Sequence, residues 1–171
     1  MVNNFSRFIL NWKVSLELSA QTCLENIREA YNKYLPANPE NTETMLLCDG
    51  RSENNNTLVE EYMEQVPLKK VIANEIGISN SMVEAVNKNI KYRYLFQDNI
   101  PDFPALVKYL EKAVQDYNYH KPHWAHKGLT PAEALDGVIL NTEELKEQVK
   151  AACRARIEYN KQQNCENFII L

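Results

Sequence analysis

The feature that most constrains the fold is a repeated order of short apolar runs and helical segments. Met45–Cys48 is a continuous apolar run that ends at Asp49-Gly50, and Leu68–Ala73 is a second short run. The residues between them, about 58–65, follow an asparagine-rich segment and fit a helix. A strand–helix–strand order is typical of α/β folds. The unbroken apolar run at 45–48 further predicts a strand covered on both faces.

The N-terminal part of the chain predicts one more strand and one more helix. Residues 7–18 alternate in part between apolar and polar types, which indicates a strand with one buried side. Ser19 then caps a helix over about 20–34. The apolar face of that helix consists of Cys23, Ile27, Ala30, Tyr31 and Tyr34.

The remainder of the chain is predicted to be helical. Helices are expected over about 81–96, 103–119, 131–136 and 143–163. Asp102 is the expected N-cap of the second of these, and Thr130 with Glu133 forms a capping box before the third. Three strands with this many helices predict an α/β domain over 1–136, followed by a helical C-terminal extension over 137–171.

Composition restricts the class of protein. Of 171 residues, 44% are hydrophobic and 25% are charged, as in soluble globular domains. No run reaches the apolar length of a membrane span, and the first residues do not resemble a secretion signal. The four cysteines form no closely spaced pair, which predicts reduced thiols in a cytoplasmic protein. Cys23, Cys48, Cys153 and Cys165 are these cysteines.

The charge of the chain is unevenly distributed. The formal net charge is −4, but residues 69–127 carry nine basic and six acidic side chains. Residues 1–68 and 128–171 are net acidic. A surface that binds phosphate is therefore expected in the middle third, although a solvated charged face explains the same imbalance.

Two carboxylates are candidates for metal-dependent chemistry. Asp49 follows a predicted strand, and Glu84 lies 35 positions further on, in the first turn of a predicted helix. On that helix Glu84, Lys88 and Lys91 share one exposed edge. Phosphoryl-transfer sites combine carboxylate ligands for Mg²⁺ or Mn²⁺ with nearby cations. Structural alternatives are an Asp49-Gly50 turn, a capping box from Ser81 to Glu84, and a Glu84–Lys88 ion pair.

A histidine-rich loop follows the third predicted helix. His120, His123 and His126 are spaced by threes around Pro122, which excludes a helical metal site. We expect these histidines to be structural or to face DNA. Trp124, in the same loop, is expected to be a packing residue.

Five segments with recognisable patterns occur in a fixed order along residues 2–136. They are Asn4–Arg7 with Ile9–Trp12, Leu46–Glu53, Ser79–Lys91, Tyr117–His123 and Gly128–Ala134. Together they resemble the integrase core of bacterial insertion-sequence transposases, a DDE-type family whose relatives include the retroviral integrases. The last two segments, for example, are similar to the family patterns Y-N-x-x-R-P-H and G-x-T-P-x-E.

The resemblance implies a ribonuclease-H-like mixed sheet flanked by helices, with DNA as substrate. It makes Asp49 and Glu84 catalytic ligands of Mg²⁺ or Mn²⁺. It also makes Lys91 a contact to the DNA near the cleavage point, with Asn87 and Lys88 beside it on the same helix. In the loop after the third helix, Lys121 and His123 become further DNA contacts.

Three departures from the family pattern predict an inactive remnant. The family's first catalytic aspartate lies on a strand upstream of the first matching segment, and the sequence starts almost at that segment. We therefore expect a sheet without its first strands, weak metal binding and homo-oligomerisation through an exposed sheet edge. Arg51 stands where the family has a small residue, which is costly if the turn requires positive φ. Lys121 replaces a usual arginine and so lacks its bidentate fork.

Other functions stay open at this point. A non-catalytic DNA-binding or oligomerisation module would retain the carboxylates without using them. A helical interaction protein would place Asp49 and Glu84 far apart. A glycoside hydrolase also uses two carboxylates, but the sequence has no aromatic platform for a sugar.

Overall fold

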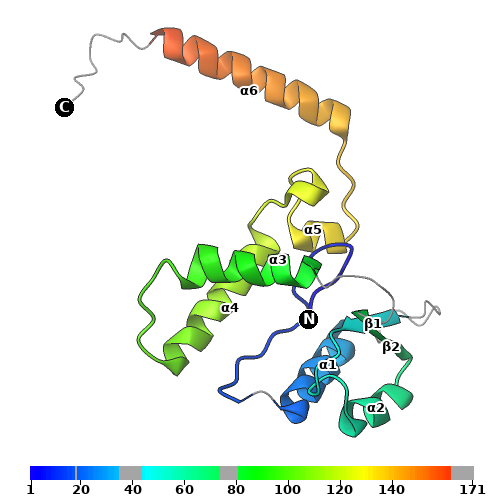
Figure 1. Ribbon diagram of the computed structural model, residues 1–171. Coiled ribbons are helices and arrows are strands. Elements are labelled where there is room, and N and C mark those ends of the chain that lie inside the picture. Colours follow the sequence, from blue (N-terminus) through cyan, green and yellow to red (C-terminus); the bar gives the residue numbers. More distant parts are fainter. Residues whose placement is uncertain (18, 35–43, 74–80, 163–171) are drawn as a thin grey trace. The chain divides into compact units, whose positions relative to one another are not determined.

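The computed structural model describes residues 1–17, 19–34, 44–73 and 81–162. The chain divides into two compact units, Met1–Asp136 and Gly137–Leu171, and each is described here by itself (Figure 1). The first unit contains the two described strands and the helices up to α5, and the second contains α6.

The first part of the larger unit is built around two parallel strands. β1 (Thr44–Cys48) pairs with β2 (Leu68–Ile72), with Thr44 opposite Leu68, and α2 (Thr57–Glu64) connects them. The predicted strand–helix–strand unit is therefore confirmed, as is the helix α1 (Ala20–Tyr34). Its core is formed by Leu24, Ile27, Val59, Met63 and Leu68.

The expectation that the first apolar run is covered on both faces is wrong. Met45 is 66% exposed and Leu47 is 36% exposed, whereas Leu46 packs against the core of α1, α2 and β2. Successive side chains of a strand point to opposite faces. Within the described residues only the Leu46 face of β1 is packed, so the apolar run does not indicate burial on both sides.

Within its described residues, 7–17, the strand predicted over 7–18 does not form either. Ile9 forms one isolated antiparallel bridge with Val2, and its backbone is otherwise paired by a side chain. Asn118 accepts a hydrogen bond from the Ile9 amide at 2.9 Å and donates one to the Ile9 carbonyl at 3.0 Å. The side-chain amide of Asn118 thus satisfies the backbone groups of Ile9 that a neighbouring strand would pair. The segment is therefore extended without joining a sheet.

The second part of the larger unit is helical. α3 (Ser81–Ile90) continues into a π-helical segment, Lys91–Leu95, so the single helix predicted over 81–96 changes its hydrogen-bond register at residue 91. α4 (Phe103–Tyr119) and the short α5 (Pro131–Leu135) follow. The core of this part consists of Ile9, Val86, Ile90, Ala113, Val114 and Tyr117.

Both predicted helix starts in this part are confirmed by side-chain hydrogen bonds. Asp102 accepts from the Ala105 amide at 2.8 Å and caps α4. Thr130 and Glu133 form the reciprocal capping box of α5. Such caps satisfy amides that have no partner within the helix.

The smaller unit contains one long helix, α6 (Thr142–Gln162), and every residue of this helix is exposed. Its charged side chains pair along the helix, as in Lys146 with Glu143 and Lys150 with Glu147, both at 2.8 Å. Among the described helices, none has the length and apolar character needed to cross a membrane.

Candidate functional site

Asp49 lies directly after β1, and both of its carboxylate oxygens are engaged. Asn54 donates its side-chain amide to Oδ1 at 2.6 Å, and Nε of Arg51 lies 3.3 Å from Oδ2. The Asp49 side chain is 39% exposed and that of Arg51 is 69% exposed. The negative charge of the carboxylate is therefore balanced by a residue of its own loop, and the side chain stays partly exposed to solvent.

Hydrogen bonds connect the loop that contains Asp49 to α1 and to β2. The Cys23 thiol on α1 donates to Oδ1 of Asn54 at 2.9 Å, so Asn54 bridges α1 and Asp49. Burial raises the pKa of the Cys23 thiol, and the nearby charges of Glu53 and Asp49 raise it further. The ammonium of Lys70 on β2 donates to Oδ1 of Asn55 at 3.1 Å. These contacts position Asn54 independently of any ligand.

The residues around Asp49 do not form a ready-made site for a divalent cation. A carboxylate coordinates Mg²⁺ or Mn²⁺ through its oxygens, and here each oxygen already has one partner, the Asn54 amide or the Arg51 guanidinium. Across the described ranges, no group of three or more histidine, cysteine or acidic side chains is placed to hold a metal ion. An ion at Asp49 would compete with the Arg51 guanidinium for Oδ2.

The backbone cost expected for Arg51 does not arise. Arg7 and Lys127 are the described non-glycine residues with positive φ, and Arg51 is not among them. Its importance lies instead in the ion pair with Asp49, which the sequence reasoning missed. The relevant signals were a cation two positions after the acid and the run Asn54–Asn56 that follows.

The second carboxylate lies on an exposed face of α3. Glu84, Asn87, Lys88 and Lys91 are all exposed, whereas Val86 and Ile90 are buried on the other side of the helix. The predicted exposed edge with one acid and two bases is therefore confirmed. Although both residues are described, no ion pair joins Glu84 to Lys88, so that structural alternative is wrong.

The two residues expected to contact DNA from the histidine-rich loop are partly buried. Lys121 donates to Oδ1 of Asn89 on α3, and its ammonium lies 5.6 Å from the centre of the Tyr117 ring. Burial lowers the pKa of Lys121, with a further contribution from Arg93. Lys121 therefore fastens the loop to α3 besides carrying a charge.

His123 has a comparable structural role. Its Nδ1 accepts a hydrogen bond from the Ala125 amide at 3.2 Å, which caps the 3₁₀ turn Trp124–His126. Burial lowers the pKa of His123, and the neighbouring His126, Arg7 and Lys121 lower it further. The imidazole is therefore neutral near pH 7 and offers a hydrogen bond rather than a charge.

Trp124 is not a packing residue, contrary to the expectation from the sequence. Its side chain is 95% exposed, although the residues on either side of it belong to a hydrogen-bonded turn. His120 lies apart from the other two histidines, at the end of α4, with Nδ1 3.9 Å from Oδ1 of Asp116.

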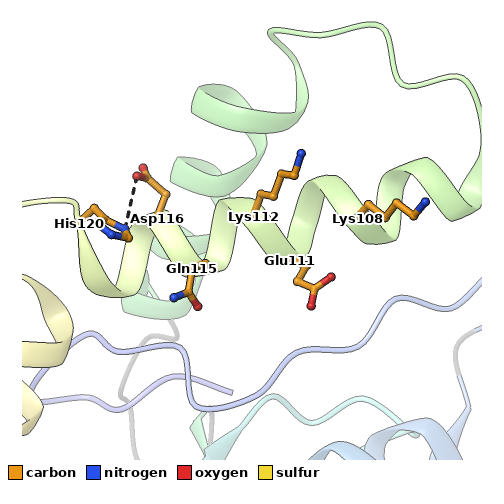
Figure 2. Close-up of a pocket in the computed structure, with 6 residues that line it drawn as sticks. All are labelled: Lys108, Glu111, Lys112, Gln115, Asp116 and His120. Carbon is orange, nitrogen blue, oxygen red and sulfur yellow. Dashed lines mark ion pairs between the residues drawn. The ribbon is translucent and has the colours of Figure 1, made fainter.

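A hollow on α4 contains none of the predicted site residues. Figure 2 shows that the side chains lining it come from this one helix and from His120, the residue that caps its C-terminus. They are Lys108, Glu111, Lys112, Gln115, Asp116 and His120. The mixture of opposite charges on a single helix is that of a solvated face, and the hollow brings no second element toward it.

Comparison with known proteins finds a family match for part of the chain. Residues 70–131 match the family model of the integrase core domain. The resemblance to integrase cores is confirmed. This integrase-core segment, residues 70–131, spans α3 and α4 and includes Glu84 and His123. Asp49 precedes it. No curated protein sequence matches the chain.

A solved structure supports the same fold. The chain is similar to the HTLV-2 integrase catalytic core domain, which was solved in complex with magnesium in a trimeric form. The match has a TM-score of 0.57 and 15% sequence identity, and it covers 78% of this chain and 80% of that chain. At this identity the likeness shows the fold alone, which is a mixed α/β fold similar to that of the integrase core.

Proposed function

We propose that the larger unit is the catalytic-core remnant of a DNA transposase or integrase, which binds DNA and transfers no strand as this polypeptide. The observation that carries the proposal is the integrase-core match over residues 70–131. This match supports a relationship of the chain to a family of polynucleotidyl transferases, whose reaction is DNA integration. In this proposal Gly137–Leu171 is a helical extension of the core.

The exposed face of α3 is the proposed DNA contact. Lys88 and Lys91 lie on this face with Asn87 and Glu84, and all four are exposed within the segment that matches the family. Lysine side chains attract the phosphate backbone without regard to sequence. Lys121 and His123 add contacts in this proposal, and their hydrogen bonds hold them in place before DNA arrives.

Inactivity follows in this proposal from the state of Asp49. Asp49 and Glu84 correspond to metal-ligating positions of the family, but the Asp49 oxygens face Arg51 and Asn54. We infer that Mg²⁺ or Mn²⁺ binds weakly, in competition with the Arg51 guanidinium. The positive charge of Arg51 also repels an incoming cation.

A non-catalytic DNA-binding or oligomerisation module is the second candidate, and the same ion pair favours it. The likeness to a core domain that was solved in a trimeric form supports association with further copies of the chain. Homo-oligomerisation and a location in the cytoplasm are parts of the proposal. The wide spacing of the cysteines in the sequence supports a reducing compartment.

The decisive experiment combines DNA binding with a cleavage assay. The purified chain is titrated into labelled duplex at several salt concentrations, with and without Mn²⁺, and the same samples are tested for nicking and strand transfer. We expect binding that weakens with salt and no cleavage. Cleavage by the purified chain that is lost in Asp49→Asn would contradict the proposed inactivity. If the DNA affinity does not change with Mn²⁺, the result favours the non-catalytic module.

A further inference from the structure

The exposed ring of Trp124 is presented by a rigid turn. The amide of Lys127 donates to the Trp124 carbonyl at 3.1 Å, and the amides of His126 and Gly128 donate to the His123 carbonyl at 3.0 and 3.2 Å. Lys127 adopts the left-handed conformation, with φ of 55°, that closes the turn. The backbone beneath the ring is therefore fixed, so that only the side-chain torsions of Trp124 lose freedom when a ligand stacks on the ring.

A second exposed aromatic ring lies in contact with this turn. Phe5 is 76% exposed, and its ring centre is 6.1 Å from that of His126. Phe5 belongs to a turn fixed by Asn3, whose Oδ1 accepts from the amides of Phe5 and Ser6 at 3.0 and 2.8 Å. Ser6 is fully buried, so this turn is anchored as firmly as the other.

Basic residues adjoin the two rings in the sequence. Arg7 lies two positions after Phe5 and is held by hydrogen bonds to Asn4, while Lys121 and Lys127 lie on either side of Trp124. The Lys121 ammonium lies over the Tyr117 ring, which meets the His123 imidazole edge-on, and the charges of Arg7 and Lys121 help to lower the pKa of His123. We name this surface the aromatic–basic patch: Phe5, Arg7, Lys121, His123, Trp124, His126 and Lys127.

Two polar atoms beneath the patch make no hydrogen bond within the described residues. They are the hydroxyl of Tyr117, which is 1% exposed, and Nε2 of His126. The Tyr117 ring contacts both Lys121 and His123, so its hydroxyl belongs to the same cluster. An unpaired buried polar atom is costly, and because both atoms are buried, a ligand on the patch reaches them only if the turn shifts.

We propose that the aromatic–basic patch binds an unpaired nucleotide of DNA, with the base stacked on Trp124 or Phe5 and the phosphates against Arg7, Lys121 and Lys127. The inference rests on the proposed DNA-binding function and specifies the form of the DNA. Exposed rings with adjacent cations are the means by which proteins hold single-stranded nucleic acid. In a continuous duplex the faces of the bases are covered by their neighbours, so a frayed or single-stranded end is required.

The test compares a blunt duplex with the same duplex carrying a single-stranded thymidine extension, by fluorescence anisotropy with the full chain. We expect the extension to bind more tightly, and Trp124→Ala to reduce its affinity by about 5- to 150-fold, the range for one stacked base. Blunt-duplex affinity should change less than about twofold, since no base face is offered there. Trp124→Phe should retain part of the preference because phenylalanine also stacks.

Tyr159→Ala is the matched control, because this aromatic residue of α6 is 62% exposed and lies outside the patch. Circular dichroism verifies that each variant is folded. The inference is overturned if Trp124→Ala leaves the preference for the extension intact, or if it weakens both DNAs equally. It is also overturned if Trp124→Ala changes only the oligomeric mass measured by light scattering, since the ring would then contact another protein chain. Failure to bind either DNA contradicts the proposed function itself.

Discussion

The guanidinium of Arg51 forms an ion pair with the carboxylate of Asp49, with Nε 3.3 Å from Oδ2, and the two residues are separated by only one residue in the chain. The position that the resemblance assigns to a metal ligand therefore already faces a cation. An exposed pair of this kind contributes little to stability, roughly 0–1 kcal/mol. Opening the pair to admit a divalent ion costs this same small amount, and screened repulsion from the guanidinium adds to it.

The exposed lysines of α3 predict a specific salt dependence of DNA binding. Replacing Lys88 and Lys91 together with alanine should weaken affinity for duplexes of any sequence and reduce the slope of log affinity against log salt by about two. Fluorescence anisotropy at several salt concentrations measures both quantities. Lys146→Ala is the control, because Lys146 is ion-paired with Glu143 on α6. An unchanged slope in the double variant would remove α3 from the interface.

Asn118 predicts a large loss of stability on substitution. Asn118→Leu removes both hydrogen bonds to the buried backbone of Ile9, at 2.9 and 3.0 Å, and leaves an amide and a carbonyl without partners. We expect the free energy of unfolding to fall by about 2–4 kcal/mol in urea denaturation. The control is Asn87→Leu on the exposed face of α3, which should change it by less than about 0.5 kcal/mol. Equal effects of the two substitutions would show that Asn118 does not anchor this segment.

The capping box of α5 predicts a pH dependence of stability. The backbone amide of Thr130, and then its hydroxyl, hydrogen-bond to Glu133 and hold the pKa of that carboxyl below its ordinary value of 4.5. The folded state therefore binds this proton less readily than the unfolded state. Its contribution to stability is present above pH 4.5 and is lost as pH falls through the lowered pKa of the folded state.

Glu133→Gln should make the urea midpoint less sensitive to pH below 4.5, because the amide does not titrate. Glu158→Gln is the control, since Glu158 lies on α6 and pairs with Lys161 instead of capping a helix. If the wild-type chain and Glu133→Gln lose stability in parallel on acidification, the capping interaction has no such role.

Local signals in the sequence predicted the helices well. Asp102 and Thr130 cap α4 and α5 because a side-chain oxygen one turn before a helix satisfies amides that are adjacent in the chain. Two apolar runs with a helix between them were sufficient for the parallel pair β1 and β2. All of these features depend on residues close together in sequence.

The failures depend on distant or specific contacts. Residues 7–18 have the pattern of a strand, but Asn118, more than a hundred positions away, pairs the Ile9 backbone. The apolar character of Trp124 suggested packing, yet the surrounding turn satisfies its own hydrogen bonds and leaves the ring in solvent. For the candidate site, the motifs indicated both carboxylates, and their role as metal ligands stays a prediction. The ion pair with Arg51 was missed because periodicity carries no information on it.

The measurement that tests the account most directly is Mn²⁺ binding by isothermal titration calorimetry to the wild-type chain, Arg51→Gly and the double variant Arg51→Gly/Asp49→Asn. Removing the competing guanidinium should raise Mn²⁺ affinity by about tenfold, from screened repulsion and the freed oxygen together. The Asp49→Asn change should then abolish the gain. Thermal-shift measurements with Mn²⁺ should rank the three chains in the same order of stabilisation, without any activity assay. Tight Mn²⁺ binding by the wild-type chain that Arg51→Gly leaves unchanged would contradict the account.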